Sequence, residues 1–136
     1  MKMNRVITFG TFEIFHSGHE SFLKQAKKQG NYLLVVVARD VISQKAKGKL
    51  PRNSEKLRAN NVREAKIADK VILGSKTNNY FQTLRTYKIT KIVLGYDQKP
   101  KIAELKKALR RHKLGFIEIS RARAYNPDKY KSSKLS

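Results

Sequence analysis

The sequence predicts an α/β protein: a single doubly wound, Rossmann-like domain around a five-stranded parallel sheet. Two observations support this fold class. Strand-length apolar runs alternate with segments of helical periodicity along the chain, as in proteins built from βαβ units. Polar residues and glycines also follow the ends of several predicted strands, and ligands bind beyond the carboxyl ends of the strands in such sheets.

The first elements come from the N-terminal third of the chain. Residues 5–9 form an apolar, β-branched run that predicts the first strand, and apolar residues at helical spacing predict a helix over 17–29. Gly30 stands where a helix commonly stops. The continuous apolar run over 32–38 predicts a second strand that is buried on both faces, which is typical of a central parallel strand.

The next segment predicts a loop followed by a helix. Residues 41–53 are polar and rich in lysine, and they include Gly48 and Pro51, so we expect a mobile loop. Ser54 is a residue type that commonly caps the N-terminus of a helix, and we expect that helix over 54–65.

The remaining chain continues the alternation and completes the sheet. Short apolar runs predict strands at 70–73, 91–94 and 116–119. Helical spacing predicts helices over 80–87 and 101–112. Consecutive parallel strands joined by helices in this way form a sheet with helices on both faces.

Composition limits the class of protein. Hydrophobic residues make up 40% of the 136 residues, which is enough for one core, and residues 1–136 carry no repeat or linker, so we expect a single domain. The absence of cysteine excludes disulfides, thiolate metal sites and a cysteine nucleophile. No run approaches the roughly 20 apolar residues of a membrane span. No secretory signal is evident at the N-terminus, so a cytoplasmic protein is expected.

The charge of the chain is strongly positive. Lys and Arg number 31 against 10 Asp and Glu, which gives a formal net charge of +21. Such a surface attracts polyanions and speeds the association of phosphorylated ligands. Nucleic-acid binding is one interpretation. The other, which we favour because the basic residues are dispersed and no nucleic-acid-binding module is recognisable, is a solvated basic surface that serves an anionic small substrate.

Two histidines stand where the first predicted strand gives way to the first predicted helix. They are His16 and His19, with Gly18 between them. Backbone N–H groups point outward at a helix N-terminus, where the helix dipole favours an anion. Imidazoles donate hydrogen bonds to phosphate oxygens, and glycine lets the backbone approach closely. This arrangement predicts a phosphate-binding turn. The third histidine, His112, falls in a basic helix and is expected to be exposed without a chemical role.

Further polar residues follow the later strands. Arg39 and Asp40 follow the second strand, Gly74 and Ser75 follow the third, and residues 95–98 follow the fourth. Because the carboxyl ends of parallel strands meet at one edge of the sheet, these residues are expected to gather there with the histidines.

The segment around the histidines resembles a known family. Residues 10–19 read Gly-Thr-Phe-Glu-Ile-Phe-His-Ser-Gly-His and resemble the GTFDxxHxGH signature of the cytidylyltransferase-like nucleotidyltransferases. The resemblance implies an enzyme that joins a nucleoside triphosphate to a phosphorylated acceptor and releases pyrophosphate. Glu13 departs from the pattern, because the family usually has Asp there, but the charge is the same.

Other segments extend the resemblance. Residues 47–49, 51–58 and 69–74 are similar to segments of the family, and residues 35–40 and 93–98 are similar to its archaeal FAD synthases. The last of these contains Gly-Tyr-Asp-Gln, whereas glycerol-3-phosphate cytidylyltransferases tend toward GDDW at this place. In the basic C-terminal tail at 120–136, the stretch Ser-Ser-Lys-Leu resembles the family's STTKI motif, which binds triphosphate at the start of a final helix. The chain ends before such a helix.

The resemblance, together with phosphate chemistry, predicts the site residues. The catalytic candidates are His16, His19, Lys47 and Lys49, and the choice between the two lysines is open. The nucleotide-binding candidates are Thr8, Phe9, Gly10, Thr11, Phe12, His16, Gly18, His19, Gly95, Asp97, Ser132, Ser133 and Lys134. The candidates for binding the acceptor are Arg39, Asp40 and Arg58. No protein metal site is expected, and Mg²⁺ is expected to travel with the triphosphate.

The resemblance favours one activity and leaves two alternatives. The favoured activity is transfer of AMP from ATP to FMN, which gives FAD and pyrophosphate. One alternative is a cytidylyltransferase that uses CTP and glycerol 3-phosphate or another phosphorylated alcohol. The other is a non-catalytic nucleic-acid-binding protein. By analogy with the family we expect a homodimer.

Overall fold

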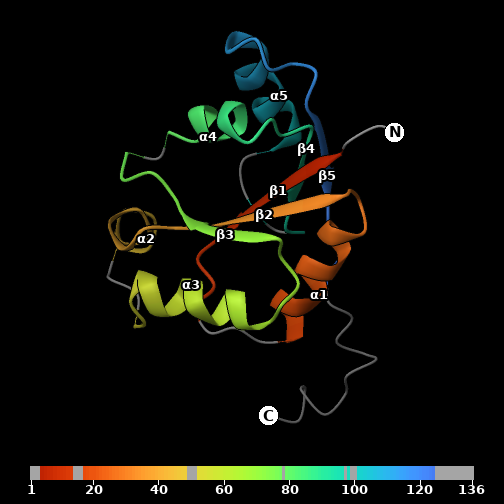
Figure 1. Ribbon diagram of the computed structural model, residues 1–136. Helices are drawn as coiled ribbons and strands as arrows, with labels where there is room; N and C mark the ends of the chain where they lie inside the picture. Colours follow the sequence, from red (N-terminus) through yellow and green to blue (C-terminus); the bar gives the residue numbers. More distant parts are fainter. Residues whose placement is uncertain are drawn as a thin grey trace.

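The fold is that of an open parallel sheet with helices on both faces (Figure 1). The computed structural model describes residues 4–13, 17–48, 52–77, 79–96, 98 and 101–124. The elements in chain order are β1 (Arg5–Gly10), α1 (Ser17–Lys27), β2 (Tyr32–Val37), α2 (Asp40–Lys47), α3 (Glu55–Glu64), β3 (Lys70–Leu73), α4 (Phe81–Thr86), β4 (Lys91–Leu94), α5 (Ile102–Arg111) and β5 (Glu118–Arg121).

The five described strands form one parallel sheet in the order β3-β2-β1-β4-β5. β1 lies at the centre, where Ile7 pairs with Leu34 of β2 on one side and with Ile92 of β4 on the other. The chain reverses its direction of travel across the sheet between β3 and β4, so the point where strand order switches lies between β1 and β4. This confirms the predicted fold class and places the ligand-binding edge of such sheets at β1.

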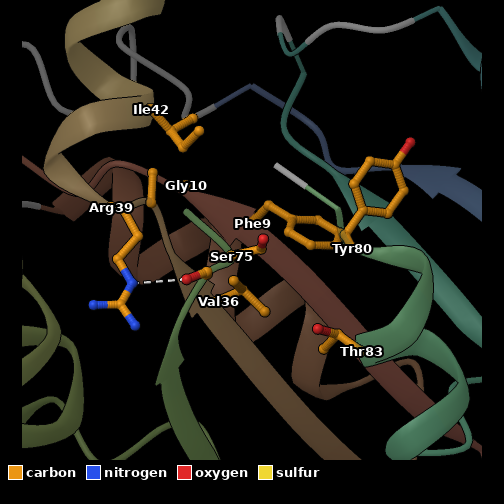
Figure 2. A pocket seen from close by; sticks show the side chains of 10 residues that line it. Phe9, Gly10, Val36, Arg39, Ile42, Ser75, Tyr80 and Thr83 are labelled. Atoms are coloured by element: carbon orange, nitrogen blue, oxygen red, sulfur yellow. Dashed lines mark hydrogen bonds between the residues drawn. The ribbon is translucent and has the colours of Figure 1, made fainter. Parts of the chain in front are cut away.

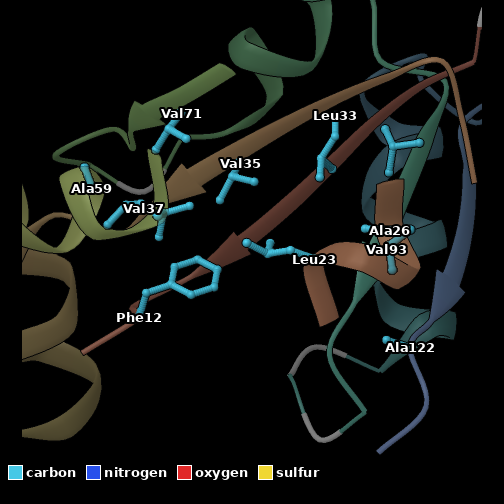
Figure 3. Packing of buried hydrophobic residues seen from close by; sticks show 12 residues of the cluster. Phe12, Leu23, Ala26, Leu33, Val35, Val37, Ala59, Val71, Val93 and Ala122 are labelled. Atoms are coloured by element: carbon cyan, nitrogen blue, oxygen red, sulfur yellow. The ribbon is translucent and has the colours of Figure 1, made fainter. Parts of the chain in front are cut away.

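Helices cover the two faces of the sheet and bury two apolar cores. α1 and α3 lie below the sheet in Figure 1, and α4 and α5 lie above it. The core on the α1 and α3 side includes Val6, Leu23 and Val35, and Figure 3 shows this cluster. The core on the other side includes Ile7 and Leu84. Successive residues of β1 and β2 therefore point to opposite cores, which is why the β2 sequence is apolar throughout.

The elements match the predicted ranges closely, with one shifted strand. β5 occupies Glu118–Arg121 instead of 116–119, because Phe116 lies in the turn that precedes the strand and is 67% exposed. The apolar character of Phe116 and Ile117 drew the predicted strand toward the turn. Only Ile117 of this pair is buried, and it packs in the core on the α4 and α5 side.

The loop predicted over 41–53 is wrong in its first half. α2 forms there, with Asp40 in its first turn and Gly48 closing it in the left-handed conformation at φ 78°. The segment is polar, but Ser43 is buried and Ile42 is half-buried, so one side of the helix packs on the protein. The first turn of α2 is stabilised by Glu55, which lies fifteen positions later in the chain. The local pattern of polar residues does not reveal such a contact.

Two predictions about helix ends had different outcomes. Ser54 caps α3 as predicted, since its side chain accepts a hydrogen bond of 3.2 Å from the Leu57 N–H. Gly30 follows α1, but its φ is not positive, so it is not a left-handed helix stop. Glycine is required there because a Cβ would lie 2.4 Å from the Asn4 carbonyl oxygen.

Candidate active site at the carboxyl edge of the sheet

The loops that follow β1, β2, β3 and β4 form one edge of the sheet, and described residues that were predicted there, such as Arg39 and Gly74, come together. The Gly10 carbonyl accepts a hydrogen bond from Ala38 N–H at 2.8 Å, and the Val37 carbonyl accepts one from Gly74 N–H at 2.9 Å. Backbone bonds therefore continue past the strand ends and hold the three loops beside one another.

The turn after β1 has a backbone conformation that fixes two aromatic rings. Phe12 has φ 53°, a left-handed conformation that costs about 1–2 kcal/mol for a residue with a side chain. Its ring is 3% exposed and covers Gly10, where a Cβ would lie only 2.6 Å from the ring. The ring also contacts the His19 imidazole edge-on, with centroids 5.3 Å apart. Gly10 and Phe12 thus position His19.

The helix that carries His19 begins at the predicted place. α1 starts at Ser17, so Gly18 and His19 lie in its first turn. The preceding turn is tied to the loop before α3, because Glu13 Oε1 accepts from Asn53 N–H at 2.9 Å. Glu13, which departs from the family pattern, therefore serves in this structure to anchor the turn.

A cavity of about 90 Å³ opens at the ends of β1, β2 and β3, next to this turn (Figure 2). Its lining residues come from the three strand ends and from α2 and α4. They are Phe9, Gly10, Val36, Ala38, Arg39, Ile42, Gly74, Ser75, Tyr80 and Thr83.

One wall of the cavity is aromatic. The Phe9 and Tyr80 rings meet edge to face with centroids 5.5 Å apart, and Tyr80 lies 4.6 Å from Phe81. Figure 2 shows Phe9 and Tyr80 on one side of the cavity and Arg39 on the other. Burial raises the pKa of Tyr80, so its phenol stays neutral around neutral pH. The cavity combines apolar ring surfaces with a cation at its rim.

Arg39, Asp40 and Glu55 form a reciprocal cap between two helices. Glu55 Oε1 accepts from Asp40 N–H at 2.9 Å, at the start of α2. Asp40 Oδ2 accepts from Glu55 N–H at 3.4 Å, at the start of α3. Arg39 donates from Nη1 to Glu55 Oε2 at 2.9 Å and from Nε to the Gly74 carbonyl at 2.8 Å. The backbone hydrogen bond from Asp40 and the Arg39 guanidinium together lower the pKa of Glu55 despite its partial burial.

Arg58 lies beneath this cap. It is fully buried, and its three nitrogens donate to the Asn53 carbonyl at 3.0 Å, the Thr11 carbonyl at 2.7 Å and Asp40 Oδ1 at 2.6 Å. A buried guanidinium is stable only when its donors are satisfied in this way. Arg58 therefore links the β1 turn to both helix starts.

The turn after β4 is held by Gln98 and Arg121. Gln98 Oε1 accepts from Gly95 N–H at 2.6 Å, and Gln98 Nε2 donates to the Phe9 carbonyl at 2.7 Å. The side chain thereby spans the switch point between β1 and β4. Arg121, at the end of β5, donates from Nη1 to the Gly95 carbonyl at 2.9 Å and to the Gln98 carbonyl at 2.8 Å.

Comparison with known proteins identifies the family to which this fold belongs. A family model described as cytidylyltransferase-like matches residues 7–136. The chain belongs to this family.

Relatives within the cytidylyltransferase-like family include proteins named FAD synthase. One from Thermococcus sibiricus is 37% identical over 98% of this chain and 90% of its own length. One from Thermoplasma volcanium is 39% identical over 98% of this chain and 92% of its own length.

Solved structures agree on the fold. A Thermoplasma volcanium protein named for lipopolysaccharide core biosynthesis has a TM-score of 0.85 and 38% identity, covering 92% of this chain and 100% of the other. Pantoate-β-alanine ligase from Francisella tularensis has a TM-score of 0.64 at 11% identity, covering 98% of this chain and 66% of its own, and shows the fold alone.

Several residues predicted for this cytidylyltransferase-like site lie outside the described residues. They are His16, Lys49, Asp97, Ser132, Ser133 and Lys134. The backbone of Lys47 ends α2, but its side chain is not described. The roles of these residues stay predictions. Thr8 is fully buried inside β1, and its hydroxyl has no hydrogen-bond partner in the part of the chain that the structure describes.

The structure also brings in residues that the sequence prediction missed. Ile42, Tyr80 and Thr83 line the cavity, while Gln98 and Arg121 hold the β4 turn. Tyr80 precedes a short helix and carries no motif, so only the topology places it beside β1. Gln98 lies inside the Gly-Tyr-Asp-Gln segment that drew attention to this turn, and that resemblance was the available signal.

Two absences are noted for the described residues. None of their helices is both long enough and apolar enough to cross a bilayer. No group of three or more His, Cys, Asp or Glu side chains among them is arranged to hold a metal ion.

Proposed function

We propose that this protein is an FMN adenylyltransferase, which makes FAD and pyrophosphate from FMN and ATP. FAD synthases that match it over nearly its whole length support this activity. The structural observation that carries the proposal is the aromatic-walled cavity beside the β1–α1 turn. A planar, largely apolar ring system is the acceptor class that such a wall accommodates.

The reaction is a phosphoryl-centre substitution. An oxygen of the FMN phosphate forms a bond to the α-phosphorus of ATP, while the bond from that phosphorus to the α–β bridging oxygen breaks. The electron pair leaves with pyrophosphate. Negative charge grows on the leaving oxygen and on the α-phosphate oxygens, so hydrogen-bond donors and cations placed there lower the barrier.

The β1–α1 turn supplies those donors in our proposal. His19, oriented by Phe12, and the N-terminal end of α1 bind the triphosphate. His16 acts with His19, and Lys47 or Lys49 neutralises charge on the α-phosphate or the acceptor. Ser132, Ser133 and Lys134 hold the β- and γ-phosphates, and Asp97 contacts the nucleoside. The family resemblance supports these assignments.

The acceptor occupies the cavity in this proposal. The cavity holds only part of the flavin ring system, because its volume is about 90 Å³. The apolar edge of the flavin enters it and packs on Phe9 and Tyr80. Arg39 lies at the rim. Its Nε and Nη1 donate to Gly74 and Glu55, and in this proposal its Nη2 contacts the acceptor. Asp40 and Arg58 act as positioning residues that set Arg39 and the β1 turn.

Magnesium enters with the triphosphate in this proposal. Phosphate oxygens and water are the ligands that we propose, since Mg²⁺ usually keeps several waters and binds through substrate phosphates. The ion would neutralise phosphate charge during binding. We also propose a homodimer, as the family analogy predicts, and sedimentation at several protein concentrations tests it.

The activity is tested with paired substrates. ATP or CTP is combined with FMN or glycerol 3-phosphate and Mg²⁺, and both pyrophosphate and the joined product are quantified by chromatography. We expect turnover with ATP and FMN. Turnover with CTP and glycerol 3-phosphate alone would establish the cytidylyltransferase alternative instead.

The acceptor cavity has its own test at Tyr80. Replacing it by Ala removes the ring that faces Phe9, so the KM for FMN should rise about three- to tenfold while the KM for ATP changes little. Tyr80→Phe keeps the ring and is the matched control, with a KM for FMN close to that of the wild type. Equal effects of Tyr80→Ala on both KM values would contradict the placement of the flavin.

A further inference from the structure

The ion pairs of the described residues are unevenly distributed. Four are present, and they join side chains of α1, α2, α3 and the segment before β3. Residues 81–117, which contain α4 and α5, contribute to none of them, although this stretch of sequence holds ten Lys and Arg residues against two Asp and Glu. The positive charge on this side of the sheet is therefore uncompensated among the described residues.

Seven exposed cations of α4, α5 and the turns after them define what we term the α4–α5 cationic surface. They are Arg85, Lys88, Lys106, Lys107, Arg110, Arg111 and Lys113. The two helices are joined at this surface by His112. Its ring stacks on Phe81 with centroids 3.6 Å apart, and its carbonyl accepts from Arg85 Nη2 at 3.1 Å. These contacts hold α4 and α5, and the cations on them, together.

Like charges lie close together along the exposed part of α5. Lys106 and Arg110 are one turn apart, as are Lys107 and Arg111, and like charges at this spacing repel. The opposite side of the helix is buried through Leu105 and Leu109. An anionic polymer could contact all four of these cations at once and relieve the repulsion. A small phosphorylated ligand would reach only one or two of the four.

An exposed aromatic ring adjoins the cations. Phe116 is 67% exposed, more than any other large hydrophobic residue that the structure describes. It follows Gly115, which lies against Arg110, since a Cβ on this glycine would be 3.1 Å from Arg110 Cγ. Hydrogen bonds from Leu114 N–H to Leu109 O and from Ile117 N–H to Leu114 O fold the turn back on α5. The turn that carries Phe116 therefore lies against the end of α5, with Gly115 beside Arg110.

We propose that the α4–α5 cationic surface, with Phe116 as a stacking platform, binds single-stranded nucleic acid. Cations that follow a backbone, together with an aromatic ring on which a base stacks, are the two elements of sequence-independent single-strand binding. A duplex offers phosphates but no unstacked base to Phe116. The surface precedes β5, at the amino end of the strands, whereas the candidate active site lies at their carboxyl ends. Binding here leaves the active site open.

The cationic part is tested by removing two charges from the full-length protein. Binding of a fluorescent oligouridylate and oligothymidylate is measured by anisotropy between about 50 and 200 mM salt. Lys107→Gln with Arg111→Gln should reduce the slope of log affinity against log salt by about 1.4, since each phosphate contact contributes about 0.7. The ratio of wild-type affinity to variant affinity should therefore fall about sevenfold between the lowest and the highest salt concentration. The two oligonucleotides distinguish RNA from DNA.

The matched control removes the same charge elsewhere. Lys56→Gln with Lys66→Gln neutralises two exposed lysines at α3 and the turn after it, on the other face of the sheet. It should keep the wild-type slope. If both double variants change the slope equally, the attraction belongs to the net charge of the whole molecule, and the assigned surface is wrong.

The aromatic part is tested separately. Phe116→Ala should weaken single-strand binding about tenfold and leave both the salt slope and the binding of a duplex unchanged. Leu57→Ala, at another exposed apolar residue, is the control and should change none of these. Unchanged single-strand affinity in Phe116→Ala overturns the proposal, as does tighter binding to vesicles of anionic lipid than to either oligonucleotide. The two double variants, Phe116→Ala and Leu57→Ala should all keep the wild-type rate of FAD synthesis, because none of them changes a residue of the candidate active site.

Discussion

At the scale of single residues, the site depends on rings and amides that neighbouring residues hold in place. Phe12 accepts an unfavourable backbone conformation so that its ring packs between Gly10 and His19. Such local strain persists only where surrounding packing compensates for it. The imidazole is thereby oriented before any nucleotide binds.

His19→Ala should lower kcat by about a hundredfold or more, because a donor to the developing phosphate charge is lost. Steady-state rates with ATP and FMN measure this effect. His112→Ala is the control: His112 is exposed and follows α5, toward the amino end of the strands, so its variant should keep the wild-type kcat. A His19→Ala enzyme with near-normal turnover would refute the assigned role.

Gln98→Ala should raise the KM for ATP severalfold, because the Gly95 N–H and the Phe9 carbonyl lose the side chain that joins them. Gln98 acts by positioning, so the KM should change more than kcat, and Gln98→Glu should fail to restore the bond to the Phe9 carbonyl. Gln82→Ala on α4 removes an exposed amide of the same type and serves as the control. An unchanged KM for ATP would show that the β4 turn needs no such clamp.

At the scale of elements, α2 and α3 stabilise each other at their starts. Each helix receives a carboxylate from the other, Glu55 at α2 and Asp40 at α3. Carboxylates near helix N-termini are favoured by the unpaired N–H groups and by the helix dipole. Losing one of them therefore destabilises both helices and, through Arg39, the rim of the cavity.

The Glu55 cap makes stability depend on acid pH. The folded state holds the pKa of Glu55 below its ordinary 4.5, so its stabilisation is complete above that pH and is lost as the pH falls through the lower folded value. Glu55→Gln should cost about 1 kcal/mol at neutral pH. Urea unfolding should show that this difference shrinks as the pH falls below the ordinary Glu pKa and through the lower folded value. The pKa of Asp69 is also lowered, but Asp69 is present in the wild type and in Glu55→Gln alike, so its contribution cancels in the difference.

A cost that stays constant down to the lowest pH at which the fold survives would mean that the Glu55 charge does not act as described. Ser54→Ala, which removes a neutral cap from the same helix, should give such a pH-independent loss of about 1 kcal/mol and is the matched comparison.

The sequence predicted elements well where local periodicity and packing agree. β2 is apolar at every position because both of its faces are covered, and Ser54 caps α3 through a bond to its own helix. α2 was missed because its polar residues give no strong apolar stripe and its N-terminal cap comes from Glu55, fifteen positions away. Long-range capping is decided by the fold.

The candidate site shows the same division. His19 and the β1 turn follow from a motif, and the edge of the sheet follows from topology. The roles of Tyr80 and Arg121 do not, because the first depends on α4 lying beside β1 and the second on β5 lying beside β4. Burial of Arg58 was also unforeseeable, since a charged residue on a helix is usually exposed.

At the scale of the whole molecule, a net charge of +21 opposes compaction. Raising NaCl from about 10 to about 150 mM shortens the Debye length from about 30 to about 8 Å and should raise the Tm by several degrees, since self-repulsion is screened. The Lys107→Gln and Arg111→Gln protein, with less repulsion, should gain less from salt. A Tm that falls on adding NaCl would mean that the four ion pairs outweigh the excess charge.

The central position of β1 has a consequence for synthesis of the chain. Of the five described strands β1 is synthesised before the others, and it can pair early with β2, but its other edge waits for β4, about 85 residues later. Until Lys91–Leu94 emerges, the nascent sheet exposes an open, apolar edge that other chains can join. Fragments that stop before residue 91 should therefore aggregate, and slow translation of the middle of the gene should lower the yield of native protein.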